Sequence, residues 1–296
     1  MQQVLNAMVL WSVYVLFALG LSLAWGSMKL LNLAHGAVFM FSGFAAHLIS
    51  QQFQLPFWMV LTIAMLVGGL LSVVLDLLLF HPVKVRVKDE GQAELLMLIG
   101  SIGAGSILVS IAQMFTDDSP FGIAQASALT SDLIQLGAIK ISTAQILIVV
   151  LGVAFSIAVG IWVRATQSGR ALRAIAFDEE TSQLMGINPR RLSTLTMFVA
   201  GALAGVGSVL LMSHVGALIP TSGDAFLVKA FAVIILGGIG SVAGVVVGAA
   251  VLAIGESLVL TFTTGEWVDA ASFAIIMAFV LLRPQGIFAV KTADRV

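Results

Sequence analysis

Long apolar runs that almost no charged residue interrupts divide this sequence, and they restrict its fold more than any other feature. A helix needs roughly 20 apolar residues to cross about 30 Å of membrane hydrocarbon, because each residue adds about 1.5 Å. Runs of about this length lie at residues 4–25, 30–50, 57–80, 93–115, 143–163, 193–213, 242–262 and 267–283. Together with a shorter apolar stretch, Phe226–Ile239, they predict an all-α, polytopic transmembrane helical bundle of about 8–9 spans.

The composition supports the bilayer as the main solvent of the chain. Of its 296 residues, 59% are hydrophobic and 10% are charged, whereas soluble domains are typically about 25% charged. The net charge of −1 indicates no nucleic-acid partner. The absence of cysteine excludes disulfides, thiolate nucleophiles and cysteine metal sites. With no tandem repeat or low-complexity linker, residues 1–296 are interpreted as a single transmembrane domain.

The positions of the basic residues predict the orientation, because cytoplasmic loops of membrane proteins are enriched in lysine and arginine. If Phe226–Ile239 crosses, nine spans with the amino terminus outside place 12 of the 14 basic residues in the cytoplasm. Only Lys140 and Lys229 fall elsewhere. This count favours nine spans and a cytoplasmic carboxy terminus. The short stretch is expected to cross obliquely or as a broken helix.

One predicted cytoplasmic loop, residues 164–192, is polar and strongly patterned. Leu172 and Ile175 have helical spacing, and Gly186 followed by Pro189 is typical of a helix end. The loop therefore predicts one or two short amphipathic helices. Such an element fills a groove on a cytoplasmic partner, lies along the membrane surface, or forms an ordinary ordered loop. In the docking interpretation, the residues that engage the partner are Arg170, Arg173, Asp178, Glu179, Glu180 and Gly186.

Three segments carry a resemblance to a known family. Their sequences are GRALRAIAFDEETSQLMGINPRRLSTLTMFVAGALAGVGSVLL, LLNLAHGAVFMFSGFAA and FLVKAFAVIILGGIGSVAGVVVGAAVLAIGES. Taken in order, they resemble the permease subunits of branched-chain (hydrophobic) amino-acid ABC importers from about residue 20 to residue 286. The run Glu180–Gly186 has the spacing of the Glu-Ala-Ala-x3-Gly loop of ABC importer permeases. It departs from that motif because Thr181 and Ser182 replace the alanines, and the later Ile-x-Leu-Pro part is not at the usual distance.

The resemblance implies a multi-pass permease subunit in a bacterial cytoplasmic (inner) membrane that works by alternating access. The implied partners are two ATP-binding subunits, a second homologous permease chain, an extracytoplasmic substrate-binding protein and membrane lipid. Branched-chain amino acids are the implied cargo; related permeases carry urea or short amides. Gly237–Ser241 lacks the Lys-Ser/Thr pair of a phosphate-binding loop, so ATP hydrolysis is expected on separate chains and no cofactor or enzyme activity is expected here.

Two sequence features are candidates for the translocation pathway, each with a purely structural alternative. Asn32 and His35 precede a predicted span, where they either cap the helix or face the pathway. Gly237, Gly238 and Gly240 lie at the end of the short stretch and predict a break in a helix, and discontinuous helices often mark transport sites. Glycines elsewhere, such as the Gly201–Gly205 pair, favour tight helix packing.

Ionisable residues inside the spans bear on two other function classes. Asp76 and Glu256 lie within apolar runs, and both are expected to reach water or the membrane interface. An ion-coupled secondary transporter stays an alternative, although such paired groups are sparse. An intramembrane enzyme needs a nucleophile–base pair or metal ligands at membrane depth, and the sequence shows no such pattern.

Overall fold

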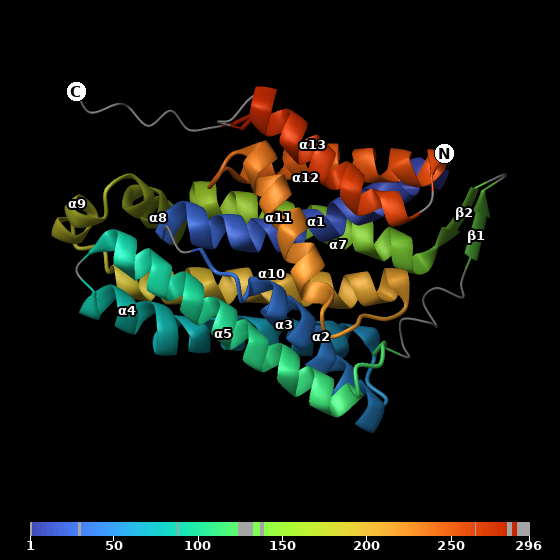
Figure 1. Cartoon of the computed structure of the whole chain (residues 1–296), viewed down its shortest axis with the longest axis horizontal. Helices are drawn as coiled ribbons and strands as arrows, with labels where there is room; N and C mark the ends of the chain where they lie inside the picture. The colour runs from blue at the N-terminus through green and yellow to red at the C-terminus, as the bar shows by residue number, and fades with distance from the viewer. Residues whose placement is uncertain are drawn as a thin grey trace.

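The computed structural model describes residues 2–28, 31–87, 89–123, 133–136, 139–263, 265–282 and 286–288. Within these residues the protein is an elongated helical bundle, which confirms the all-α prediction (Figure 1). Its helices are α1 (Gln2–Met28), α2 (His35–Gln52), α3 (Phe57–Leu75), α4 (His81–Arg86), α5 (Glu90–Thr116), α7 (Thr143–Ala165), α8 (Gln167–Phe177), α9 (Glu179–Leu184), α10 (Pro189–Val215), α11 (Ser222–Gly237), α12 (Val242–Phe262) and α13 (Val268–Leu282).

Four smaller elements complete the described secondary structure. A π-helical turn, η1 (Asp76–Phe80), joins α3 to α4. A 3₁₀ turn, η2 (Gly265–Trp267), precedes α13. The strands β1 (Leu133–Leu136) and β2 (Ile139–Ser142) pair antiparallel at the end of the bundle opposite α8 and α9 (Figure 1).

Six described helical segments are long and apolar enough to cross a membrane. They are Gln3–Gly26, Phe57–Arg86, Gly91–Thr116, Thr143–Ala165, Pro189–Val215 and Val242–Phe262. α2, α11 and α13 have 18, 16 and 15 residues, so they extend about 27, 24 and 23 Å at 1.5 Å per residue. These lengths fall short of the hydrocarbon thickness, so the total of eight or nine crossings stays a prediction.

Burial divides the long helices into central and peripheral ones. In the most apolar window of each, 78% of α1 and 83% of α10 is buried, but only 22% of α5 and 28% of α7. α1 and α10 therefore form the centre of the subunit. α1 and α10 are hydrophobic on all sides, so their sequences do not show whether protein or lipid surrounds them. The fold shows that protein encloses them.

The central helix α10 packs against α3 through small residues. A Cβ atom added to Gly201 would lie 2.0 Å from the carbonyl oxygen of Gly68. At Gly205, an added Cβ would lie 2.0 Å from the carbonyl oxygen of Ala64. This close approach of two backbones confirms that the Gly201–Gly205 pair serves tight packing.

Candidate functional site

The predicted cytoplasmic end is built from α4, α8 and α9, which gather at one end of the bundle (Figure 1). The ends of α7 and α10 that flank α8 and α9 lie there too. The described basic residues on these elements are Lys84, Arg86, Arg164, Arg170, Arg173, Arg190 and Arg191. The opposite end carries β2 with Lys140. This separation of charge agrees with the predicted orientation.

Helix α8 is fixed to the end of α7 by its own arginines. Arg173 donates hydrogen bonds to the carbonyl oxygens of Val163 and Arg164, and Arg170 donates to that of Ala165 at 3.2 Å. These are carbonyls of the last turn of α7, where cations are favoured by the helix dipole. Both arginines, predicted as contacts for a partner, thus also hold α8 in position.

The inner face of α8 anchors the loop to the bundle. Leu172 and Ile175 are buried, as their spacing predicts for an amphipathic helix. Thr166 caps the helix by accepting a hydrogen bond from the backbone N–H of Gly169 at 3.1 Å. The loop is therefore an ordered helix with one buried face.

Helix α9 is short and begins with a well-formed cap. Asp178 accepts hydrogen bonds from the backbone N–H of Thr181 at 3.0 Å and from its hydroxyl at 2.8 Å. Glu179 forms an ion pair with Lys84 of α4 at 3.5 Å, while Glu180 is exposed. The acidic residues therefore begin a second helix, as predicted, and only one of them reaches a neighbouring element through a described ion pair.

Gly186 ends this second helical segment. Its φ is +84°, a left-handed conformation that favours glycine, and an added Cβ would meet no atom within 4 Å. Pro189 then begins α10, which is capped by Asn188. The predicted helix end at Gly186 is confirmed; that Pro189 also begins the next helix was not predicted.

Three large apolar side chains stand uncovered at this tip. Phe177, Leu184 and Met185 are 81%, 87% and 80% exposed. Clustered exposed apolar groups of this kind mark interaction surfaces. Leu184 and Met185 lie in the run Glu180–Gly186 that the motif comparison picked out, whereas Phe177 was not singled out from the sequence. Its only signal is an aromatic residue at the junction of the two short helices. We call these three residues the apolar tip.

The first pathway candidate lies inside the subunit. His35 is 1% exposed, stacks on the ring of Phe17 with centroids 4.7 Å apart, and its Nε2 lies 3.2 Å from the Phe17 carbonyl oxygen. Asn32 is also 1% exposed and accepts a hydrogen bond from the N–H of Ala34 at 3.0 Å. Ala34, not Asn32, is the N-cap residue of α2. Asn32 therefore stabilises the turn before α2 instead of capping the helix.

The start of α2 meets the start of α11. A Cβ on Gly36 would lie 2.4 Å from the carbonyl oxygen of Gly223, and one on Gly223 would lie 2.1 Å from that of Gly36. Two short helices therefore begin at one point; α11 packs on α1, and α2 contacts α1 through the rings of His35 and Phe39 against Phe17. The sequence offered one weak signal for this contact, a glycine directly after the first residue of each helix.

The second pathway candidate forms a turn. Gly237 ends α11, and Gly238 and Gly240 have φ values of +99° and +79°. The N–H of Gly240 donates to the hydroxyl of Ser22 on α1 at 3.2 Å, and Ser241 then caps α12. The glycines thus connect two helices beside the end of α1; they do not interrupt a single helix, because the left-handed residues reverse the chain.

A buried ionic cluster joins α1, α11, α12 and α13. Glu256 of α12 is 1% exposed and lies 3.1 Å from Nζ of Lys229 on α11. It also accepts hydrogen bonds from Tyr14 of α1 and, at 2.6 Å, from Ser272 of α13. Asp269 lies 3.5 Å from the same Lys229 ammonium. The expectation that Glu256 reaches water is wrong, because four helices enclose it and supply a counter-charge.

Comparison with known proteins decides the family. The sequence matches the family described as branched-chain amino acid transport system / permease component over residues 3–281. The chain belongs to this family. It is therefore a membrane permease subunit of a branched-chain amino acid ABC importer family, as the three-segment resemblance predicted.

Named relatives extend over the whole permease. It is 28% identical to the high-affinity branched-chain amino acid transport system permease protein LivH of Salmonella typhimurium, covering 100% of this chain and 97% of the relative. Identity to BraD of Pseudomonas aeruginosa is also 28%, covering 100% and 98%. LivM of Escherichia coli is 25% identical, covering 93% of this chain and 67% of LivM.

A solved structure supports the fold alone. PsaBC from Streptococcus pneumoniae in complex with Fab superposes with a TM-score of 0.50 at 16% identity. The match covers 96% of the permease and 93% of that chain. The helical arrangement is therefore shared over nearly the full length.

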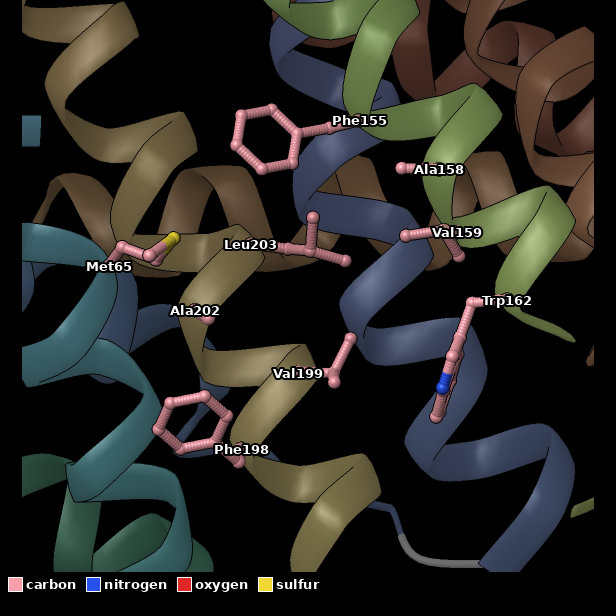
Figure 2. A pocket seen from close by; sticks show the side chains of 9 residues that line it. All are labelled: Met65, Phe155, Ala158, Val159, Trp162, Phe198, Val199, Ala202 and Leu203. Carbon is pink, nitrogen blue, oxygen red and sulfur yellow. The ribbon is translucent and has the colours of Figure 1, made fainter. Parts of the chain in front are cut away.

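An apolar groove separates α7 from the α3–α10 pair in the permease (Figure 2). It has a volume of about 210 Å³. The residues that line it are Met65, Phe155, Ala158, Val159, Trp162, Phe198, Val199, Ala202 and Leu203. α7 thus packs loosely against α10, in contrast with the backbone contact between α10 and α3.

Proposed function

We propose that this permease moves branched-chain amino acids into the cell by alternating access, driven by ATP hydrolysis on two separate ATP-binding subunits. The observation that supports ATP coupling best is the apolar tip on α8 and α9. A helix presents such side chains to a hydrophobic groove on a partner. The tip lies at the end of the bundle where the described basic residues gather, which is the end expected in the cytoplasm.

In this proposal the loop 164–192 is the coupling element of a single domain, residues 1–296. Arg170, Arg173, Asp178, Glu179, Glu180 and Gly186 shape it. The contacts described for Arg170, Arg173, Asp178 and Glu179, together with the turn at Gly186, hold the apolar tip in place, while Glu180 is exposed beside it. Direct contact with the ATP-binding subunit then falls mainly to the tip.

The proposed topology has nine crossings, with the amino terminus outside and the chain in a bacterial inner membrane. Successive helices alternate between the two ends of the bundle, which supports this count (Figure 1). α2 and α11 then cross as short helices that begin inside the subunit. Irregular backbone at membrane depth is tolerated where protein covers it.

The proposed pathway involves the shared start of α2 and α11. Asn32 and His35 stand at this point, while Gly237, Gly238 and Gly240 form the far end of α11. Since both residues of the first group are buried, they would act by supporting the helix starts rather than by lining an open channel. The glycine turn would let α11 and α12 tilt relative to α1.

The remaining proposed partners are a second homologous permease chain and an extracytoplasmic substrate-binding protein. The similarity to LivM as well as to LivH supports two related permeases in one system. Urea or short amides are an alternative cargo. Ion-coupled transport is a second alternative, for which the buried Lys229–Glu256 pair is a relevant observation.

Uptake by proteoliposomes that contain the permease and these partners tests the proposal. We expect accumulation of labelled leucine that requires hydrolysable ATP and is reduced by excess isoleucine or valine. Competition by urea or acetamide, with none by valine, would favour the amide alternative. Accumulation without ATP would contradict the ATP-driven mechanism.

A further inference from the structure

A second buried carboxylate lies where the coupling loop enters the bundle. Asp76 is 2% exposed and begins the π-helical turn η1. It accepts a hydrogen bond from the hydroxyl of Ser193 at 2.9 Å and one from that of Thr194 at 2.8 Å. Both donors lie near the start of α10. Protein therefore encloses the Asp76 carboxylate, and its position at the depth of the membrane interface stays a prediction.

This carboxylate is buried at a cost. Among the described residues, no basic side chain forms an ion pair with Asp76. Two neutral hydroxyls therefore stabilise its charge, and burying a carboxylate without a counter-charge is unfavourable. A π-helical turn is itself rare and occurs often at functional sites. The buried carboxylate and the start of the π-helical turn therefore coincide at one residue, Asp76.

Asp76 continues a regular line of contact between α3 and α10. Ala64, Gly68 and Ser72 precede it at intervals of four residues, and each of these three touches the backbone of α10 or would meet an added Cβ there. Residues four apart form one ridge on a helix. The ridge consists of small side chains along the part of α3 that is expected to cross the membrane. Near the coupling loop it ends in the carboxylate of Asp76.

A second link joins the same region to α9. α3, η1 and α4 form one helical segment, Phe57–Arg86, whose end carries Lys84. Lys84 pairs with Glu179 at the start of α9. The α9 helix thus connects to α3 through Lys84, while the chain itself leads from α9 into α10.

We propose that Asp76 is a positioning residue that joins η1 to the start of α10, so that a displacement of α9 moves α3 and α10 as one body. The apolar groove between α7 and the α3–α10 pair is the seam along which the subunit deforms. The inference rests on the proposed function, since it takes α9 to be displaced by the ATP-binding subunits.

We call the two hydrogen bonds from Ser193 and Thr194 to Asp76 the junction. Two variants remove it, one from each side. Asp76→Ala deletes the acceptor, and Ser193→Ala/Thr194→Val deletes both donors. Matched controls are Ser106→Ala on α5 and Thr62→Val on α3, because each of these exposed hydroxyls bonds only within its own helix. In proteoliposomes, we expect both junction variants to lower leucine uptake per ATP hydrolysed at least fivefold. ATP hydrolysis itself stays within twofold, and both controls keep the normal ratio.

Asp76→Asn is the conservative variant, because an amide can still exchange hydrogen bonds with both hydroxyls. We expect it to recover at least half of the normal uptake per ATP. Uptake and hydrolysis falling together, at an unchanged ratio, would overturn the inference and indicate a merely structural role. A normal ratio in both junction variants would overturn it as well.

A distance measurement tests the junction independently of the cargo. The natural chain has no cysteine, so spin labels at Arg86→Cys and Arg190→Cys report only the separation of α4 from the start of α10. With Asp76 present, we expect one narrow distance distribution with and without ATP; with Ser193→Ala/Thr194→Val, it broadens when ATP binds. An unchanged distribution would refute the junction. If the unsubstituted importer takes up no leucine, the proposed function fails, and this measurement still decides the inference.

Discussion

The two buried carboxylates of this permease are stabilised in different ways at opposite ends of the bundle. Glu256 has the Lys229 ammonium 3.1 Å away and hydroxyl donors from two further helices. Asp76 has two hydroxyl donors from a single helix and, within the described part of the chain, no counter-charge. The Glu256 cluster therefore fixes four helices together. The Asp76 junction joins only two helical elements, η1 and α10, in keeping with a local link that makes α3 and α10 move as one body.

The largest expected effect is on stability, at the Glu256 end. Lys229→Met leaves Glu256 buried without its cation, which typically costs about 3–5 kcal/mol. We expect the midpoint of thermal unfolding of the purified permease in detergent to fall by roughly 10 °C, using the usual scaling for chains of this size.

The double variant Lys229→Met/Glu256→Gln is the control for that experiment. It removes both charges, so most of the lost stability should return. If the double variant is no more stable than Lys229→Met alone, the Lys229–Glu256 ion pair does not hold the four helices together.

A large effect on transport, without one on stability, is expected at the apolar tip. Leu184→Asp/Met185→Asp places charges on a surface that meets a hydrophobic groove, so uptake by the assembled importer should fall at least tenfold. The unfolding midpoint should stay within about 2 °C, since both side chains are exposed. Val215→Asp/Ile219→Asp, at exposed positions beside the end of α10 that lies away from the tip, is a matched control that should retain co-purification with the ATP-binding subunits. Normal co-purification by the tip variant would contradict docking there.

A smaller effect is expected from the cap of α9. Asp178→Ala removes the side-chain acceptor for the Thr181 N–H, and loss of such a cap costs about 1 kcal/mol. Uptake should fall a few-fold because α9 frays. Asp178→Asn retains a capping oxygen and should restore uptake; failure to restore it would assign Asp178 a role in the charge of the surface instead.

The smallest effect concerns the exposed ion pair. Lys84→Gln or Glu179→Gln should change stability by less than about 1 kcal/mol, because surface pairs are weak and screened by salt. Uptake per ATP should fall by at most twofold, and the difference from the unsubstituted permease should shrink as salt is raised. A loss of stability as large as that expected for Lys229→Met would contradict the distinction between the exposed Lys84–Glu179 pair and the buried Lys229–Glu256 pair.

Sequence patterns predicted the features that depend on local chemistry. Apolar run length predicted the long helices, and Gly186 followed by Pro189 predicted the break before α10. Contacts between residues that lie far apart in the sequence could not be predicted in this way. Nothing near Glu256 in sequence indicates Lys229, 27 positions earlier on another helix, or Tyr14 on a third. Asp76 likewise gains its donors from residues more than a hundred positions away.

The same limit explains the misjudged glycines. Gly237, Gly238 and Gly240 favour non-helical backbone, which the sequence showed correctly. Whether such a segment breaks one helix or connects two depends on what packs against it. Here Ser22 and Gly26 of α1 lie against the turn, so α11 and α12 fold back beside α1.

The central claim is that ATP hydrolysis, delivered through the cytoplasmic end, drives import while the buried pair at Glu256 serves as a static lock. Leucine uptake by vesicles with the complete importer, measured with ATP held constant and the proton gradient collapsed by a protonophore, tests this most directly. We expect uptake to continue at a rate within twofold of that of the untreated vesicles. Loss of uptake despite constant ATP would contradict it and would make the Lys229–Glu256 pair a candidate for proton coupling.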